Sequence, residues 1–194
     1  MTAALVAFDL GGVLVDVVLG RLWETLERER DEVEAAFFGD GRHDAVSVGA
    51  LAGHAYLEEA AARLRADLAQ IRRAWRAVVR VDGDAPPLVE SVATRSVAWS
   101  NTDPEHIEAL EGELPSTLLC EARALSYEIG ATKPLSAFYE SALARAGVRP
   151  GDVVFLDDRA DNITAARALG IDAVEVRGVD EARAALAARG LLRS

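Results

Sequence analysis

The chain has 194 residues, 51% of them hydrophobic, and its 32 acidic and 21 basic residues give a formal net charge of -11. This length and apolar content predict one sizeable hydrophobic core with room for an inserted subdomain. The acidic balance argues against nucleic acid and anionic membranes as partners, because both bind basic surfaces. We therefore expect a soluble globular protein, to which a small anion could still bind locally.

The only cysteine, Cys120, follows two leucines, which predicts an unreactive core residue and a reducing compartment. The apolar region 3–19 is interrupted by Asp9 and Asp16 and has no basic leader, so we expect neither a signal peptide nor a membrane span. A cytoplasmic location follows from these observations. The sequence leaves open a homodimer, although it contains no long heptad pattern.

The first predicted element is a short buried strand at Leu5–Phe8, and Gly11-Gly12 just after it allow a sharp turn. Asp9 therefore lies at the carboxyl end of this strand. From about residue 19 to residue 80, apolar residues recur at helical spacing, which predicts an all-helical insertion. Its Gly- and Asp-rich segment 39–49 predicts a loop between helices.

Strands and helices alternate again after the insertion. The predicted strands are 96–99, a short one between 117 and 126, 153–156 and 173–176, and the predicted helices are 103–112, 134–147, 161–169 and 180–189. This alternation predicts an α/β fold, a Rossmann-like three-layer core with a parallel sheet that collects ligands at the carboxyl ends of its strands. We expect a core of residues 1–17 and 83–194 and a small helical cap of residues 18–82.

Four polar clusters each close an apolar run, and together they predict one phosphate-handling site. They are Asp9, Ser100-Asn101-Thr102, Lys133-Pro134 and Asp157-Asp158. Lys133 is the only lysine among the 21 basic residues. A compact ammonium group, and not a guanidinium, is therefore expected to be needed at this position.

Read in order, these clusters resemble the motifs of the haloacid dehalogenase-like hydrolase superfamily. The resembling segments are Phe8-Asp9-Leu10-Gly11-Gly12-Val13, Ser100-Asn101-Thr102, Lys133-Pro134 and Phe155-Leu156-Asp157-Asp158. The first segment is similar to that of the Phe-Asp-Leu-Gly branch, which resembles sugar-phosphate phosphatases and the N-terminal phosphatase domain of epoxide hydrolase. The resemblance implies a Mg²⁺-dependent phosphatase that hydrolyses a small phosphorylated metabolite through an aspartyl-phosphate.

The resemblance also implies a role for each polar residue. Asp9 would be the nucleophile, and Lys133 would stabilise charge in the transition state. The other implied contacts are Asp9, the Gly11 carbonyl, Asp157 and Asp158 for Mg²⁺, Ser100 and the Asn101 amide for phosphate, and Arg42 and His43 for the rest of the substrate.

One residue departs from the family pattern. Most phosphatases of this superfamily carry a second Asp two residues after the nucleophile, where this chain has Gly11. That Asp protonates the leaving group, and losing a general acid typically costs about 10² to 10⁴ in rate. We therefore expect slow turnover, a different proton donor, or a leaving group that needs little protonation, as in sugar 1-phosphates and acyl or aryl phosphates.

Three other side chains could supply the missing proton, namely Asp16, His43 and Asp44. Asp16 is predicted to form a turn or a charge pair, while His43 has a suitable ordinary pKa. Asp161 and Asn162 are predicted to cap the following helix, with a metal contact through water as the other reading of Asp161. The sequence predicts His106 to be an ordinary helix residue, and Trp75 and Phe38 to pack within the cap.

Two alternative functions stay open from the sequence. Metal-free 2-haloacid dehalogenation uses the same nucleophilic Asp, but the dehalogenases carry an aromatic residue in place of Gly11 and lack the paired acids at Asp157-Asp158. A catalytically degenerate phosphate-binding module would retain the metal and phosphate sites without turnover.

Overall fold

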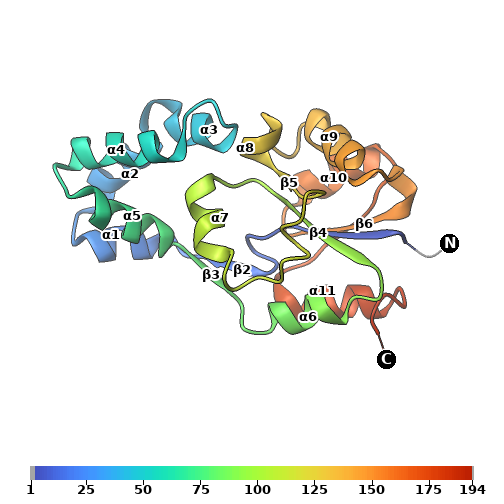
Figure 1. The fold of residues 1–194 in the computed structure, drawn as a ribbon. Helices are drawn as coiled ribbons and strands as arrows, with labels where there is room; N and C mark the ends of the chain where they lie inside the picture. The colour runs from blue at the N-terminus through green and yellow to red at the C-terminus, as the bar shows by residue number, and fades with distance from the viewer. Residues whose placement is uncertain (1–2, 194) are drawn as a thin grey trace.

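The computed structural model describes residues 3–193. Figure 1 shows two parts: a sheet with helices on both faces, and a helical lobe beside it. Two hydrophobic clusters fill the first part, one on each face of the sheet, and a third lies inside the helical lobe. Each part therefore buries its own apolar surface, which supplies most of the free energy of folding.

The sheet has five parallel strands in the order β5-β4-β1-β6-β7. Their bounds are β1 Leu5–Phe8, β4 Arg95–Ser100, β5 Ala124–Leu125, β6 Val153–Asp157 and β7 Asp172–Glu175. The central strand, β1, pairs with β4 and β6, and all four of its residues are buried. Burial on both faces explains why a continuous apolar run, and not an alternating one, marks this strand in the sequence.

Helices cover both faces of the sheet, as Figure 1 shows for α9 and α10 on one side and α6 and α11 on the other. Val6 and Phe8 point to the α6 and α11 side, and Leu5 and Ala7 to the opposite side. The helices of this part are α6 Ala85–Ser91, α7 Pro104–Leu110, α8 Ser126–Ile129, α9 Ser136–Ala146, α10 Ala160–Ala168 and α11 Gly178–Ala187. The predicted three-layer α/β fold is confirmed.

The helical lobe follows the first strand in the chain. It contains α1 Gly20–Leu26, α2 Arg30–Phe38, α3 Arg42–Ser47, α4 Gly53–Leu64 and α5 Leu68–Arg76. The loop predicted over residues 39–49 is wrong, since a 3₁₀ turn at Gly39–Gly41 leads directly into α3. Arg42 and Val46, four residues apart, are both buried on the inner side of α3, a contact that composition alone does not predict.

A two-stranded antiparallel ribbon connects the lobe to the core. It consists of β2 Val15–Val17 and β3 Val79–Val81, and it places Asp16 opposite Arg80, whose guanidinium donates a 2.8 Å hydrogen bond. The charge pair predicted for Asp16 is confirmed. These strands were not predicted, because a three-residue run is too short to show a period. We propose residues 18–82 as the cap, since they hold a separate apolar cluster.

The segment predicted to hold a strand between residues 117 and 126 is mostly turns. Backbone hydrogen bonds from Leu118 to Pro115 and from Arg123 to Cys120 close successive turns, and only Ala124–Leu125 forms a strand. Leu118 is buried but Cys120 is exposed, so the prediction of a core cysteine is wrong. No helix among residues 3–193 has the length and apolar character needed to cross a membrane.

Candidate active site

Adjacent strands bring three of the polar clusters together. Asp9 directly follows β1, Ser100 ends β4 and Asp157 ends β6, and these three strands are neighbours in the sheet. Parallel strands end at the same edge, so residues far apart in the sequence meet there. Lys133 joins them from the segment between α8 and α9.

Lys133 uses all three donors of its ammonium group inside the protein. Its Nζ lies 3.0 Å from Asp9 Oδ1 and donates to Asp157 Oδ2 at 2.6 Å and to the Trp99 carbonyl at 2.8 Å, and its side chain is fully buried. The Asn101 side chain fixes the backbone on either side of it, through bonds of 2.8 and 2.9 Å to the amide and carbonyl of Lys133. A flat guanidinium could not make this compact set of bonds.

Asp9 is nearly buried, and its Oδ1 also accepts a 2.7 Å bond from the Leu10 amide. Burial raises its pKa to about 7, Lys133 opposes the rise, and the neighbouring charge of Asp157 adds to it. The Asp9 carboxylate therefore loses part of its charge near neutral pH when no metal ion is bound beside it. A metal ion beside it would favour the charged form.

Three carboxylates could hold a metal ion: Asp9, Asp157 and Asp158 each offer an oxygen within 4.8 Å of the others. They differ in what else they bind. Asp157 is fully buried and accepts bonds from Lys133, the Asn162 amide group and the Arg159 backbone amide. Asp158 is only half-buried, and its pKa is raised by burial and by Asp157. These contacts make Asp157 a residue that positions Lys133 and leave Asp158 more open to a ligand, while the metal contact of Asp157 stays a prediction.

Two further observations fit a hard cation at this position. Among the described residues, the buried Asn162 Oδ1 has no hydrogen-bond partner, although Asn162 lines the same cavity. Gly12 has φ +72°, and a Cβ there would lie 2.5 Å from Asp158 Cγ, so only glycine leaves room for this carboxylate. Oxygen donors of this kind suit Mg²⁺.

The capping role predicted for Asn162 is wrong. Helix α10 has Arg159 at its N-cap position, and the Asn162 side chain instead donates to both oxygens of Asp157. Asp161 is exposed and forms an ion pair with Arg159 at 2.8 Å. The pattern Asp-Asn before a helix is typical of a cap, so the sequence carried no signal for this tertiary contact.

The segment 100–102, which is predicted to bind phosphate, is held in place by Ser126. The Ser126 hydroxyl accepts from the Thr102 amide at 3.0 Å and donates to the Thr102 carbonyl at 3.1 Å. Ser100 is buried, and Ser100 and Asn101 both line the cavity. The predicted phosphate contacts, Ser100 and Asn101, are thus beside Asp9 and Lys133.

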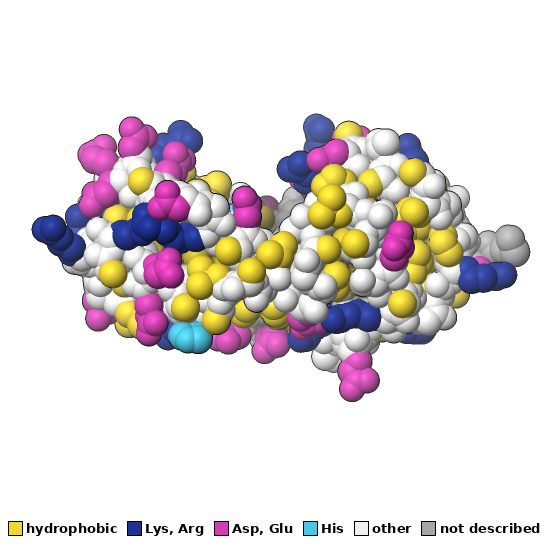
Figure 2. Space-filling view, turned by 90° about the horizontal axis from the view of Figure 1, so that it is seen from above, with side chains coloured by type: hydrophobic (Ala, Val, Ile, Leu, Met, Phe, Trp, Pro, Cys, Tyr) yellow, Lys and Arg dark blue, Asp and Glu magenta, His cyan; other side chains and the backbone are white. Residues whose placement is uncertain are grey.

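A cavity of about 640 Å³ extends from these residues to the helical lobe. Figure 2 shows the hollow between the two lobes, with hydrophobic side chains across the narrow part that joins them. From the helical lobe, the residues that line the cavity are Leu19, Phe38, His43, Asp44, Ser47, Trp75 and Val78. The helical lobe therefore contributes side chains to the same cavity as Asp9 and Lys133.

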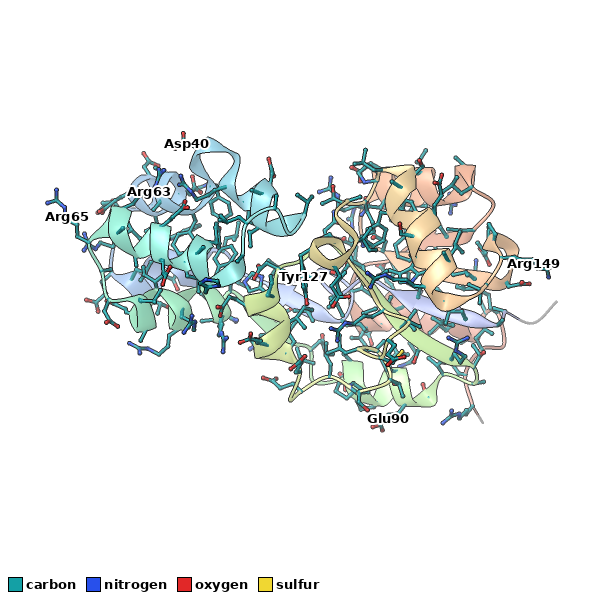
Figure 3. All side chains as sticks on the ribbon, turned by 45° about the horizontal axis from the view of Figure 1, so that its top comes forward. Asp40, Arg63, Arg65, Glu90, Tyr127 and Arg149 are labelled. Carbon is teal, nitrogen blue, oxygen red and sulfur yellow. The ribbon has the colours of Figure 1, made fainter. Side chains whose placement is uncertain are left out.

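His43 and Arg42, both predicted to contact substrate, differ in their positions. His43 lines the cavity, and burial lowers its pKa, opposed by Asp103 and Asp44. Arg42 is buried away from the cavity lining, where its guanidinium binds the Ala36 carbonyl, Glu59 and Asp40. Figure 3 shows Asp40 at the upper edge of the helical lobe, with Arg63 near it. Arg42 is therefore held within the lobe and outside the cavity lining, and its contact with a substrate stays a prediction.

The sequence missed a polar cluster at the junction of the two parts. Asp103 caps α7 by accepting from the Glu105 and His106 amides, and its other oxygen accepts from Trp75 Nε1 at 3.2 Å and lies 3.0 Å from His106 Nδ1. The His106 ring stacks on Trp75 at 4.5 Å, and both line the cavity. In the sequence, the Asp-Pro pair signals only the start of a helix, because Trp75, the partner of Asp103 from α5, is distant in sequence.

Comparison with known proteins agrees with this architecture. The structure is similar to a HAD family enzyme, bt-2542 from Bacteroides thetaiotaomicron, with a TM-score of 0.77, 20% identity and coverage of 91% of this chain and 95% of that one. A magnesium complex of that enzyme has a TM-score of 0.74 and 21% identity, with coverage of 91% of this chain and 94% of that one. It is also similar to L-2-haloacid dehalogenase from Xanthobacter autotrophicus, with a TM-score of 0.65, 20% identity and coverage of 90% and 78%.

Two comparisons concern sequence. A curated relative, drimenol cyclase drtB of Aspergillus calidoustus, is 34% identical over 87 residues, which are 45% of this chain and only 16% of that protein. The family model described as haloacid dehalogenase-like hydrolase matches residues 3–170. Its match spans most of the chain and includes every polar cluster of the site. The chain therefore belongs to the haloacid dehalogenase-like hydrolases.

Proposed function

We propose that this hydrolase is a Mg²⁺-dependent phosphatase that acts on a small phosphorylated metabolite. The observation that carries the proposal is the pairing of Asp9 with Lys133 beside the open carboxylate of Asp158. A nucleophile, a fixed cation and an additional acid at one strand edge are the groups that phosphoryl transfer from a monoester requires.

In the proposed reaction an Asp9 oxygen forms a bond to phosphorus while the bond from phosphorus to the ester oxygen breaks. The alcohol leaves with a proton, and water then attacks the aspartyl-phosphate, which releases inorganic phosphate and restores Asp9. Lys133 Nζ, fixed 3.0 Å from Asp9 Oδ1, offsets negative charge at the transferring group. Mg²⁺ held by Asp9, Asp158 and the Gly11 carbonyl would neutralise phosphate charge and allow the carboxylate to approach.

We propose His43 as the group that replaces the acid missing at Gly11. It lines the cavity and lies next to Asp44 and near Asp103, whose charges favour its protonated form, while burial opposes that form. We expect His43→Ala to lower kcat about 10²-fold or more with a small change in KM. His54→Ala, an exposed change outside the cavity, is the control. Equal turnover in the two variants would assign the proton to another donor.

Gly11 also supports a second candidate, a phosphate-binding module without turnover. It shares every ligand of the phosphatase but needs no proton donor. The dehalogenase alternative is less well supported, because metal-free substitution at carbon gives no role to the open carboxylate of Asp158.

The deciding experiment measures phosphate release from sugar, alkyl, aryl and acyl phosphates, with Mg²⁺ or excess chelator. Release that requires both Mg²⁺ and Asp9, tested with Asp9→Asn, is the expected result. Binding of Mg²⁺ and phosphate by a folded protein that releases none would support the binding module. Halide release from a 2-haloacid would instead support the dehalogenase.

A further inference from the structure

One wall of the cavity is apolar and exposed. Val17 and Leu19 are 52% and 41% exposed, which is unusual for large hydrophobic side chains, and both line the cavity. Phe38, Val79 and Leu110 extend the same lining from α2, β3 and α7. Apolar side chains that stay exposed within a concave site mark a surface that an apolar ligand covers.

The helical lobe supplies no lysine or arginine to this cavity within residues 3–193. The lysine and arginine side chains among its lining, Lys133 and Arg159, both come from the core. Arg42, the cation nearest in sequence to the lining residues His43 and Asp44, is held by Glu59 and Asp40. A second anionic group on the substrate would therefore find no arginine or lysine there and would meet the carboxylate of Asp44 instead.

We infer that the substrate is the phosphate monoester of a largely apolar, uncharged alcohol. This inference rests on the phosphatase function proposed above. The phosphate would lie between Lys133 and Ser100, and the organic group would extend along Val17, Leu19 and Phe38. Phosphoryl transfer to Asp9 releases this group as the alcohol, with its proton supplied from the His43 end of the cavity, and water completes hydrolysis to inorganic phosphate.

The apolar wall predicts a dependence on chain length that a sugar site would not produce. Burying one methylene contributes about 0.8 kcal/mol, which corresponds to about fourfold in kcat/KM. Along the series methyl, butyl and hexyl phosphate, we expect kcat/KM to rise about two- to fourfold per methylene. These alcohols differ little in acidity, so the series reports burial and not leaving-group strength. Glycerol phosphate and glucose 6-phosphate, of similar size but polar, should react more slowly than hexyl phosphate.

Two adjacent valines offer a matched pair of variants. Val17 lines the cavity, whereas Val18, which is 41% exposed, does not. Val17→Thr keeps the shape and adds a hydroxyl group, so it should reduce the ratio of hexyl to methyl phosphate turnover by about threefold or more, while Val18→Thr leaves the ratio unchanged. A flat alkyl series, a preference for glucose 6-phosphate, or equal ratios in both variants would overturn the inference.

A binding measurement separates this inference from the phosphatase function on which it rests. Methyl and hexyl phosphonate cannot be hydrolysed at their carbon–phosphorus bond, so calorimetry with Mg²⁺ reports the apolar wall without turnover. Tighter binding of hexyl phosphonate, weakened by Val17→Thr and unaffected by Val18→Thr, would support the apolar site even if no ester were hydrolysed. In that case the phosphatase proposal alone would fail. Equal affinity for the two phosphonates would overturn the apolar site.

Discussion

At the scale of single residues, burial of the Asp9 carboxylate changes the stability of the folded protein with pH. Its pKa rises from 3.8 to about 7 in the fold, mainly through burial. Between these values the folded state keeps a proton that the unfolded state releases. The contribution of Asp9 to stability is therefore complete below pH 3.8 and is lost as the pH rises through 7.

This linkage predicts a gain in stability on removing the charge. A shift of this size corresponds to about 4 kcal/mol, so we expect Asp9→Asn to raise the free energy of unfolding by on the order of 1 to 3 kcal/mol at pH 8 without Mg²⁺. At pH 4 the two proteins should differ much less. Urea unfolding at both pH values tests the prediction, and a loss of stability at pH 8 would contradict it.

Gly12 gives a second prediction at this scale. Its φ of +72°, and the distance of only 2.5 Å that would separate a Cβ at this residue from Asp158 Cγ, leave no space for a side chain. We expect Gly12→Ala to displace the Asp158 carboxylate and weaken Mg²⁺ binding about tenfold or more, which is about 1.4 kcal/mol. Calorimetric titration measures this. Gly151→Ala is the control, because a Cβ there meets nothing within 4 Å; equal Mg²⁺ affinity in both variants would refute the argument.

At the scale of elements, α5 and α7 attach the helical lobe to the core. Arg72 and Arg76 of α5 form ion pairs with Glu105 of α7, and Trp75, between them on α5, donates to the buried Asp103. Trp75 also stacks on two rings, those of Phe37 from the lobe and His106 from α7. The aromatic packing predicted for Trp75 exists, but it joins the two parts as well as filling the lobe.

Trp75→Phe tests this attachment because it removes the indole donor and keeps an aromatic ring. A lost hydrogen bond to a charged group costs about 1.5 to 3 kcal/mol, so we expect a comparable decrease in the free energy of unfolding. Trp23→Phe, at a half-buried position in the same lobe, should change it by about 0.5 kcal/mol or less. Urea unfolding of both variants decides, and equal effects would mean that the Asp103 bond contributes nothing.

At the scale of the whole molecule, the sequence predicted what depends on local pattern. Each of the buried runs at β1, β4 and β6 ends next to its own polar residues in the chain. The α/β order and the position of Asp9 could therefore be predicted from the sequence. The predictions that failed depend on distant partners. Asn162 has the sequence pattern of a helix cap, but in the fold its side chain binds Asp157. The sequence likewise gives no signal that α4 brings Glu59 to Arg42.

The same distinction explains the apolar wall. Val17 and Leu19 belong to an apolar stretch of the sequence that does not itself indicate a ligand, and the fold places both at the cavity, Val17 on β2 and Leu19 just after it. The bond from Lys133 to Asp157 was also hidden, because it spans 24 positions of sequence. Local pattern therefore predicts which elements form, while the partners of each polar side chain follow from how those elements pack.

The net charge of -11 and the three clustered acids predict that Mg²⁺ binding would stabilise the whole molecule. A ligand that binds only the folded state adds about 2.7 kcal/mol at 100 times its dissociation constant, and 1 kcal/mol raises Tm by about 2 to 4 °C in a chain of this size. We therefore expect Tm to rise by about 5 to 10 °C with saturating Mg²⁺ and to return with chelator. Asp158→Asn should abolish the rise, whereas Asp161→Asn, an exposed acid paired with Arg159, should keep it. A rise that survives in Asp158→Asn would mean that Mg²⁺ acts by screening the overall negative charge, and the metal site would then need different ligands.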